Sequence, residues 1–596
     1  MAYDRVRAVS EITAASLSQG RWPIDNDPST RYPIYTRANI GEVFPDVVRP
    51  FSWTLWGINH SEPGWRQALI NLGAFDAEEF TADRMEMLSV FGGYGYLNVS
   101  ASRIFGRRAP GLSPEGIDAS FFGEQPDVPP YLESSTDASP KHEERLGATI
   151  AWVLSSPELP ELLETRAKLL ELRDARPALE ELSDSDLLDR CLAICEAEWE
   201  PLWVRHIMAT YHSMIPSGVI AQICASVALP QLAADILAVA GEVDSALPAK
   251  RLWRLSRMVH HDLALQQHFA DGIDGLRERI HRDPRPSCQE FRFAFEAFIN
   301  EFGFRGPNEW EVASRCWEQD PSAPLSAIDI MRRSDETASP DARMSERGEA
   351  REEALQEVRD RLSSEPEVLT QFNAAVSAAA VFFAARERTR TNCALLTHEM
   401  RMPMWELGRR YVERGQFAAA NEFSMLLVSE WQEALASETD LSRLIEERAN
   451  RCKTLEAVEP PFIVAGEVPD ISSWRSREGV GDQSIVTSIV GQPGCAGVSR
   501  GPARIVHDPA NPGELGPGDI LIARHTDPSW TPLFSAVSGV VVDVGATVSH
   551  AVIVARELGV PCVTSATDAT RLITDGAIVE VDGGAGTVTI IDAAAT

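Results

Sequence analysis

The sequence predicts a multidomain α plus α/β protein, in which a large, mostly α-helical region precedes a smaller C-terminal α/β domain. Three observations predict this class. Apolar residues recur with helical periodicity over 142–333 and again over 352–457. Pro, Gly and Ser interrupt that pattern over 458–487. Beyond them, short β-rich segments such as 518–523 alternate with Gly and Asp turns.

These changes of pattern predict the domain boundaries. Residues 1–457 are expected to form the mainly helical region, 458–487 a linker or hinge, and 488–596 the α/β domain. Within the helical region, the Gly/Pro/Ser-rich stretch 107–141 lacks sustained periodicity and is expected to be an extended insertion or lid. The polar, charged stretch 334–350 is expected to be a mobile loop.

Composition narrows the class of partner and the compartment. The formal net charge is −33, which disfavours nucleic acid and anionic membranes as partners because both attract basic surfaces. No uninterrupted apolar stretch approaches the ~18 residues that span a bilayer, and no signal-like segment opens the chain, so a cytoplasmic protein is expected.

Nine cysteines without Cys-x-x-Cys spacing predict reduced thiols and no metal site. His261 beside Asp262 lacks a third ligand at a suitable spacing.

His550 lies where a strand is predicted to turn into a helix. The apolar run 538–545 predicts a buried strand, and helical periodicity begins after the histidine. The first turn of a helix offers unpaired backbone N–H groups and a partial positive charge, which suit a phosphoryl group and disfavour a charged imidazolium. Ser549, or Thr547 before it, is placed to cap the helix and to hydrogen-bond phosphoryl oxygens. This pattern predicts a phosphohistidine, whereas a lone histidine elsewhere would favour a structural role.

Two groups of charged residues stand out in the helical region. Arg305 and Glu309 lie in a Gly-Phe-Arg-Gly-Pro-Asn-Glu turn, where the arginine could bind a phosphate or form an ion pair with Glu309 or Glu311. Arg386 and Arg390 are four residues apart on one predicted helical face, where two guanidinium groups could hold a transferring phosphoryl group. Solvated surface arginines are the alternative for this second group.

Aromatic residues gather near the N-terminus, in the stretch 44–56 that contains Trp53. Such residues form either a core or the wall of a pocket. Both uses fit a protein that binds an apolar aromatic molecule.

Residues 494–586 closely resemble the swivelling phosphohistidine domain of the phosphoenolpyruvate-utilising enzymes. The matching motifs are Gly494-Cys-Ala-Gly497, Gly501-Pro-Ala-Arg504, Gly518-Asp-Ile-Leu-Ile-Ala523, Thr526-Asp-Pro528-Ser-Trp530-Thr-Pro532, Ser549-His550-Ala551, Ala555-Arg-Glu-Leu-Gly559 and Val581-Asp-Gly583. The resemblance implies that His550 carries a phosphoryl group.

The helical region together with the C-terminal domain looks like the latter two-thirds of rifampicin phosphotransferase. The residues that carry this likeness are Asn39-Ile-Gly41-Glu42, Pro50-Phe-Ser52-Trp53, Arg305-Gly-Pro-Asn-Glu309 and Arg386-Glu387. It implies that Arg386 and Arg390 lie by the transferring group. Our own prediction adds phosphate- or substrate-binding residues to that pair, namely Arg305, Glu309, Arg388 and Trp53, with Ser549 and Thr547.

The departures from that family favour a two-component system. No ATP-grasp domain is recognised before the helical region, and no TIM barrel after His550. The arrangement most resembles the larger subunit of phenylphosphate synthase and of 4-methylphenyl phosphate (p-cresol) synthase. The implied partner is an ATP-grasp subunit that binds ATP and Mg²⁺, and the implied products are an aryl phosphate, AMP and phosphate.

The alternatives are a rifampicin-like antibiotic phosphotransferase component and a non-catalytic phosphocarrier or regulatory protein. The base that takes the phenol proton is not identified, with His261 a weak candidate.

Overall fold

The computed structural model describes residues 5–122, 128–156, 158–238, 244, 246–437, 439–477, 487–545 and 549–592. The chain forms two compact units. Unit 1 comprises Met1–Val219, Asn308–Ser314 and Ser377–Gly479, and unit 2 comprises Ile220–Pro307, Arg315–Val376 and Val480–Thr596.

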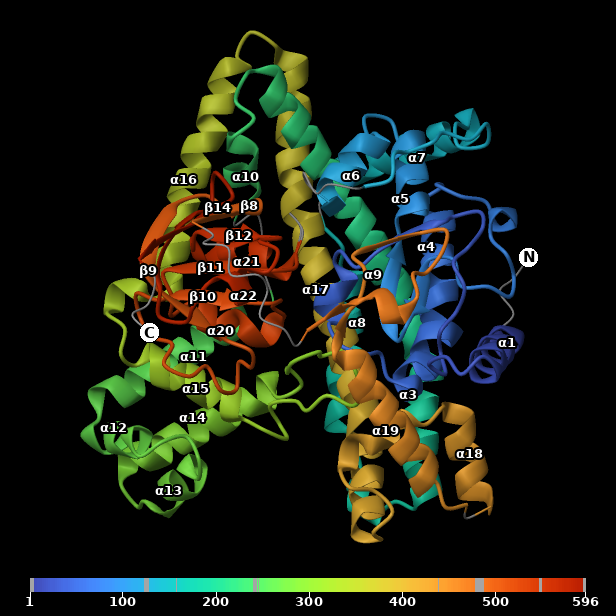
Figure 1. The fold of residues 1–596 in the computed structure, drawn as a ribbon. Coiled ribbons are helices and arrows are strands. Elements are labelled where there is room, and N and C mark those ends of the chain that lie inside the picture. The colour runs from blue at the N-terminus through green and yellow to red at the C-terminus, as the bar shows by residue number, and fades with distance from the viewer. Residues whose placement is uncertain are drawn as a thin grey trace. The chain divides into compact units, whose positions relative to one another are not determined.

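Unit 1 is mainly helical and holds a small antiparallel sheet (Figure 1). Within the described residues that sheet has the order β2-β3-β1-β5. Its strands are β1 (Ile34–Thr36), β2 (Leu88–Phe91), β3 (Tyr94–Asn98) and β5 (Ile463–Ala465). The main helices are α1 (Arg5–Ser18), α4 (Glu62–Asn71), α5 (Val99–Arg108), α6 (Pro114–Phe122), α7 (Pro140–Ser155), α8 (Glu161–Asp174), α18 (Val428–Ser437) and α19 (Ser442–Glu456), with the short α2 (Ile40–Val43) and α3 (Pro50–Ser52).

Two long helices contribute residues to both units. They are α9 (Asp184–Ser226) and α17 (Pro366–Glu413). By length and composition α17 is the one helix, among the described residues, that could cross a membrane, and 39 % of its most apolar window is buried. A core helix of a soluble protein passes the same test, so this is weak evidence for a membrane span.

A π-helix, η1 (Trp53–Ser61), joins α3 to α4 in unit 1. Such wide turns are rare and occur often at functional sites. A Cβ atom at Gly57 would lie 2.7 Å from Cδ2 of Trp53, so only glycine leaves room for the indole ring there.

Unit 2 combines helices with an eight-stranded sheet in the described portion of the chain, in the order β7-β14-β13-β9-β10-β11-β12-β8 (Figure 1). The strands β9, β10, β11 and β12 run parallel. The strands are β7 (Ser488–Val490), β8 (Gln492–Cys495), β9 (Val498–Ile505), β10 (Ile520–Ala523), β11 (Gly539–Val542), β12 (Cys562–Thr564), β13 (Ile578–Asp582) and β14 (Thr587–Asp592). The helices are α10 (Leu232–Leu237), α11 (Leu247–His261), α12 (Leu263–Ala270), α13 (Leu276–Arg282), α14 (Pro286–Phe302), α15 (Ser322–Met331), α16 (Pro340–Arg361), α20 (Thr531–Phe534), α21 (His550–Leu558) and α22 (Ala569–Leu572).

The sheet of unit 2 is covered on both faces, because successive side chains of a strand point to opposite sides. Leu521 and Val540 face a core shared with α11, α14 and α15. Ile520 and Val541 face a second core with α22. Strands buried on both faces are apolar throughout, which explains the uninterrupted runs in the sequence.

The α plus α/β class is confirmed, but the expected domain boundaries are not. The helical region predicted over residues 1–457 does not form one body, since much of 220–376 shares the apolar core of the C-terminal sheet. Apolar stripes predict that a helix is buried, but not which partner buries it.

Three local expectations also differ from the structure. The stretch 107–141 contains the end of α5 and all of α6, and residues 123–127 lie outside the described residues. The expected linker 458–487 begins with paired strands, because β5 pairs with β1 and β4 (Val458–Glu459) pairs with β6 (Arg475–Ser476). The expected loop 334–350 becomes the start of α16, where the hydroxyl of Ser339 accepts a hydrogen bond from the backbone N–H of Ala342.

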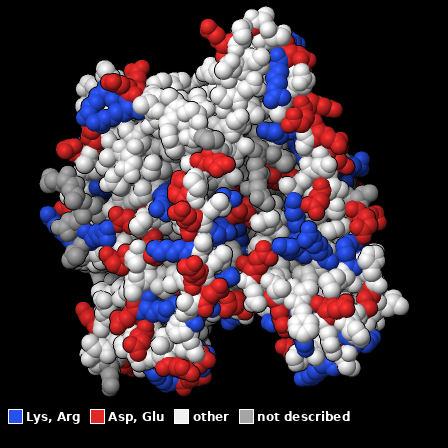
Figure 2. Space-filling model, turned by 180° about the vertical axis from the view of Figure 1, so that it is seen from behind, with Lys and Arg blue, Asp and Glu red and all other residues white. Residues whose placement is uncertain are grey.

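On the face shown in Figure 2, acidic and basic side chains are interspersed, and the basic ones form only small groups. The view therefore shows no extended basic surface on this face.

Candidate functional site

His550 is the first residue of α21, which follows β11 in the sheet of unit 2. Ser549 is the N-cap, and its hydroxyl accepts a hydrogen bond of 3.4 Å from the N–H of Val552. The strand, the helix and the serine cap predicted from the sequence are therefore present. Thr547, the other predicted cap, lies outside the described residues.

Two threonines contact the imidazole ring of His550. The Oγ1 atom of Thr526 lies 3.4 Å from Nδ1, and the Oγ1 atom of Thr531 lies 3.1 Å from Nε2. The ring of Phe534 packs edge-on at 6.1 Å, and only 2 % of His550 is exposed. A hydroxyl beside each nitrogen fixes the orientation of the ring, and burial shields the ring from water.

Helix α21 is anchored at its far end as well. It ends at Gly559 with φ of 63°, and the Nε atom of Arg556 donates a hydrogen bond of 2.8 Å to the carbonyl of Gly494 in β8. Burial lowers the pKa of Arg556. The end of α21 away from His550 is thus held on the sheet.

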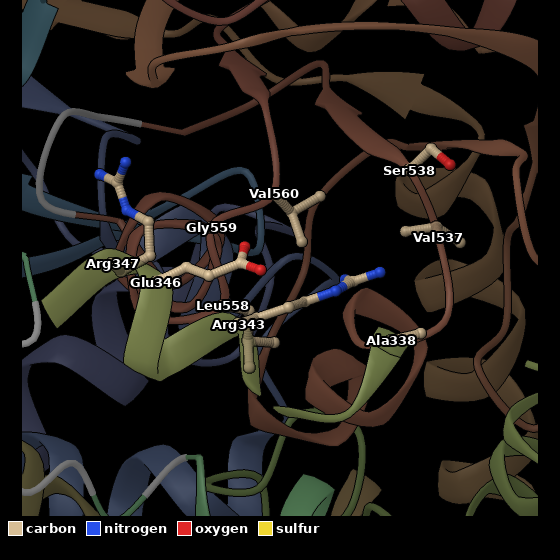
Figure 3. Close-up of a pocket in the computed structure, with 9 residues that line it drawn as sticks. All are labelled: Ala338, Arg343, Glu346, Arg347, Val537, Ser538, Leu558, Gly559 and Val560. Carbon is tan, nitrogen blue, oxygen red and sulfur yellow. The ribbon is translucent and has the colours of Figure 1, made fainter. Parts of the chain in front are cut away.

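A cavity of about 360 Å³ lies where α16 meets α21 in unit 2 (Figure 3). Arg343, Glu346 and Arg347 line it from α16, and Gly559 lines it at the end of α21. Arg347 also forms an ion pair of 3.0 Å with Asp235. The C-terminal end of a helix carries a partial negative charge, so two arginines there stabilise the packing of α16 on α21.

Arg386 and Arg390 lie on one side of α17 in unit 1. Burial lowers the pKa of Arg386. The negative charge of Glu387 raises this pKa, and the positive charge of Arg390 lowers it further. The two guanidinium groups therefore lie close enough to repel each other, as the i and i+4 spacing predicts. Arg388 is two residues from both and lies on a different face of the helix, outside the pair.

His206 of α9 lies against the same region of α17, and no sequence motif marks it. Its Nδ1 atom lies 3.0 Å from Oγ1 of Thr389. Burial, followed by the charges of Arg386 and Arg390, lowers the pKa of His206 to about 3. The imidazole is therefore neutral at physiological pH.

Aromatic rings form a continuous row in unit 1 that ends at His206. Trp53 lies 5.9 Å from Trp56, Trp56 stacks on Trp199 at 4.9 Å, and Trp199 stacks on Trp203 at 6.0 Å. Trp203 lies 5.6 Å from His206. Trp53 is fully buried at the opposite end of the row and does not contact His206 within this row.

Four indole N–H groups in and beside this row have no hydrogen-bond partner among the described residues. They belong to Trp53, Trp56, Trp203 and Trp310. A buried donor without a partner costs about 1–3 kcal/mol. These groups are therefore suited to a polar atom of a bound molecule or to water.

The segment Asn308–Ser314 brings Glu309 and Trp310 to unit 1. Arg401 holds it by donating hydrogen bonds to the carbonyls of Glu309 at 2.8 Å and Glu311 at 3.1 Å. Burial raises the pKa of Cys393. The charge of Glu309 raises this pKa further, and the charge of Arg390 lowers it. Both charged groups therefore lie near the thiol of Cys393. Glu309 is thus associated with the same region of α17 as Arg390.

Arg305 belongs to unit 2, whereas Glu309 belongs to unit 1. Its guanidinium group lies 5.0 Å from the ring centre of Phe304 and the side chain is buried. Its carbonyl accepts a hydrogen bond of 2.7 Å from the N–H of Trp317. The predicted phosphate-binding role of Arg305 stays a prediction.

Glu311 lies in unit 1, where its carboxyl group accepts hydrogen bonds from Ser52 and from the N–H of Ala313. Burial raises the pKa of Glu311. His261, the weak candidate for a base, has a side chain that is 69 % exposed and lies 3.9 Å from Glu336, which is unlike a buried base.

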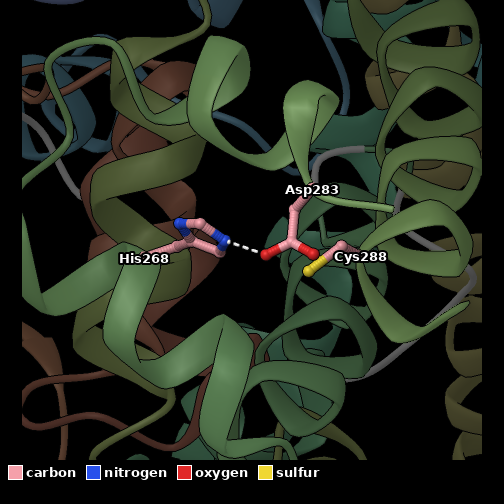
Figure 4. Close-up of side chains that lie close together, drawn as sticks. All are labelled: His268, Asp283 and Cys288. Atoms are coloured by element: carbon pink, nitrogen blue, oxygen red, sulfur yellow. Dashed lines mark hydrogen bonds and ion pairs between the residues drawn. The ribbon is translucent and has the colours of Figure 1, made fainter. Parts of the chain in front are cut away.

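Two groups of described residues offer three metal-ligand atoms within 4.8 Å of one another. One is His268, Asp283 and Cys288 (Figure 4), in which Nε2 of His268 lies 2.7 Å from the carboxylate of Asp283. Arg285 also binds that carboxylate and lowers its pKa.

The other group is Asp76, Glu79 and His142. Asp76 pairs with Lys141 and Arg145. Glu79 pairs with Arg108. Cations already neutralise the carboxylates of both groups, so ion pairing explains them without a metal.

Two family profiles match segments of the chain. Residues 515–586, which include His550, match the PEP-utilising enzyme, mobile domain. The matched segment contains β10 to β13 of the C-terminal sheet and the whole of α21. Residues 205–387, which include His206 and Arg386, match the rifampicin phosphotransferase fourth domain.

Full-length relatives are similar over about half of the chain. A rifampicin phosphotransferase of Streptomyces sp is 29 % identical over 54 % of this chain and 37 % of its own length. A prodigiosin synthesizing transferase of Serratia marcescens is 32 % identical over 54 % of this chain and 38 % of its own length. An uncharacterized protein of Mycobacterium tuberculosis is 28 % identical over 59 % of this chain and 37 % of its own length. The chain thus spans less than two-fifths of the length of these relatives.

Proposed function

We propose that this chain is the phosphate-carrying and acceptor-binding component of a dikinase-type phosphotransferase. The observation that carries the proposal is His550, which begins a serine-capped helix of a PEP-utilising enzyme mobile domain, with a threonine hydroxyl beside each ring nitrogen. A helix N-terminus and neighbouring hydroxyl groups stabilise phosphoryl oxygens. These groups suit a histidine that accepts and releases a phosphoryl group.

The proposed overall reaction is ATP + phenol + H₂O → aryl phosphate + AMP + phosphate. An ATP-grasp partner subunit would bind ATP with Mg²⁺ and place a diphosphoryl group on His550. Hydrolysis would release the outer phosphate and leave phosphohistidine. The phosphoryl group would then pass to the hydroxyl of a p-cresol-like acceptor.

Unit 1 offers the groups that the acceptor half of this reaction needs. Arg386 and Arg390 can neutralise charge on the equatorial oxygens of the transferring group. The row of indole rings suits an aromatic acceptor, and their unpartnered N–H groups suit its oxygen. Names of relatives that include phosphotransferase and transferase agree with group transfer.

A cytoplasmic location belongs to the proposal as well. It is supported by the acidic composition and by nine cysteines that are all buried and free, which fits a reducing compartment.

The test uses ATP labelled at the β- or the γ-phosphate, together with the co-purified ATP-grasp partner and p-cresol. The β-label is expected on His550 and then on p-cresyl phosphate, and the γ-label in free phosphate. His550→Ala should abolish both labelled species, while His507→Ala, which changes an exposed histidine of the same domain, should retain them. Transfer of the γ-label to p-cresol, or product formation by His550→Ala, would refute the proposal.

A further inference from the structure

His206 combines burial, a fixed orientation and a neutral ring beside two arginines. It is 8 % exposed, and its ring lies 5.4 Å from Trp310 and 5.6 Å from Trp203. Packing on both rings prevents the imidazole from turning freely. The mechanism outlined above leaves this residue unused.

The hydrogen bonds of Thr389 determine which nitrogen of His206 carries the proton. A threonine hydroxyl has one proton to donate. The hydroxyl of Thr389 donates it to the carbonyl of Arg386 at 2.9 Å, so its oxygen accepts from Nδ1–H of His206 at 3.0 Å. The Nε2 atom then carries the lone pair, and it makes no hydrogen bond within the described portion of the chain. A positioned lone pair of this kind can accept a proton.

We propose that Nε2 of His206 accepts the proton of the acceptor hydroxyl during phosphoryl transfer. This inference rests on the proposed function. The acceptor oxygen forms a bond to phosphorus while its proton moves to Nε2 of His206. The P–N bond to His550 breaks, and its electron pair stays on the imidazole of His550, which leaves as a neutral ring when its other nitrogen is protonated. His206 then returns the proton to solvent.

The charges around His206 change in the direction that this role requires. Arg386 and Arg390 oppose protonation of His206 while no anion is bound, which keeps Nε2 free. A doubly negative phosphoryl group between the arginines would offset their field and favour the protonated ring. The base would therefore become stronger when the phosphoryl group arrives.

His212 provides a matched control on the same helix. It is also buried, and burial lowers its pKa to about 4 without a contribution from arginine. Its ring packs against Trp152 at 5.1 Å and Phe382 at 5.3 Å. A substitution at His212 therefore imposes a similar disturbance on α9 away from the arginine pair.

The test is the exchange of deuterated p-cresol into unlabelled p-cresyl phosphate by the full chain alone, followed by mass spectrometry. This exchange passes through phosphohistidine at His550 and needs neither ATP nor the partner. In His206→Asn the amide can still donate to Thr389, but no basic nitrogen remains. A general base contributes about 10²–10⁴-fold, so exchange should fall by about 100-fold or more in His206→Asn and stay within about 3-fold in His212→Asn.

A second pair of compounds separates a chemical role from a structural one. 4-Nitrophenol and 4-nitrophenyl phosphate should exchange at nearly the wild-type rate in His206→Asn, because nitrophenol is already ionised at the assay pH and needs no base. Equal losses with both phenols, or wild-type exchange of p-cresol by His206→Asn, would overturn the role of His206. Absence of exchange in the wild-type chain would instead refute the proposed function, and this inference with it.

Discussion

Replacing Arg386 by Met tests whether the arginine pair acts on the transferring group. Met has a similar length and removes only the charge and the hydrogen-bond donors. Removing one preorganised donor from a developing anion typically costs about 2.7–4 kcal/mol, or roughly 10²–10³-fold in rate. The p-cresol exchange rate of Arg386→Met should fall by that factor.

The effect on stability should have the opposite sign. Burial lowers the pKa of Arg386 and Arg390 lowers it further, so the folded protein disfavours the charged form of this side chain. A neutral replacement removes that penalty, and the Tm of Arg386→Met should equal or exceed that of the wild type. Loss of activity with retained or increased stability is typical of a residue kept for function.

Arg388→Met is the matched control, because it removes the same charge from another face of α17. Exchange should stay within about 3-fold of wild type in this variant. Labelling of His550 from β-labelled ATP, which precedes transfer, should be unchanged in Arg386→Met. Equal defects in the two variants, or loss of labelling in Arg386→Met, would show that the reasoning about the pair is wrong.

Three further predictions concern unit 2. His550→Gln should keep its thermal unfolding profile but yield no phosphorylated peptide at that position when digests are analysed by mass spectrometry at alkaline pH; an adduct on another histidine of wild-type protein would contradict the assignment. Ser549→Ala should lower the free energy of unfolding by about 1 kcal/mol in urea titrations, because the cap of α21 is lost; an unchanged urea midpoint would count against it. Burial raises the pKa of Asp543 from 3.8 to about 7, so the folded protein binds this proton more tightly and wild-type stability should fall as pH rises through that range. Asp543→Asn should reduce this fall, and an identical pH profile would exclude the contribution of Asp543.

The local pattern of the sequence was sufficient to locate His550. A buried strand, a serine cap and a helix are adjacent along the chain, so their geometry follows from neighbouring residues. The structure has that strand, that helix and that cap. The i and i+4 spacing of Arg386 and Arg390 is local in the same sense.

Long-range packing decided what the sequence did not reveal. His206 and Thr389 are 183 residues apart, and only the packing of α9 on α17 brings them together. No motif marks His206, because a histidine in an apolar helix looks like any buried histidine.

The sequence by itself determined the fold class and the position of the candidate phosphohistidine, because hydrophobic periodicity and helix caps act between residues that are close along the chain. The tertiary structure decided which helices share a core with the C-terminal sheet and which side chains surround Arg386. Several segments that are distant along the chain form a buried surface together. The apolar pattern of one segment therefore predicts that the segment is buried, but not which other segments cover it.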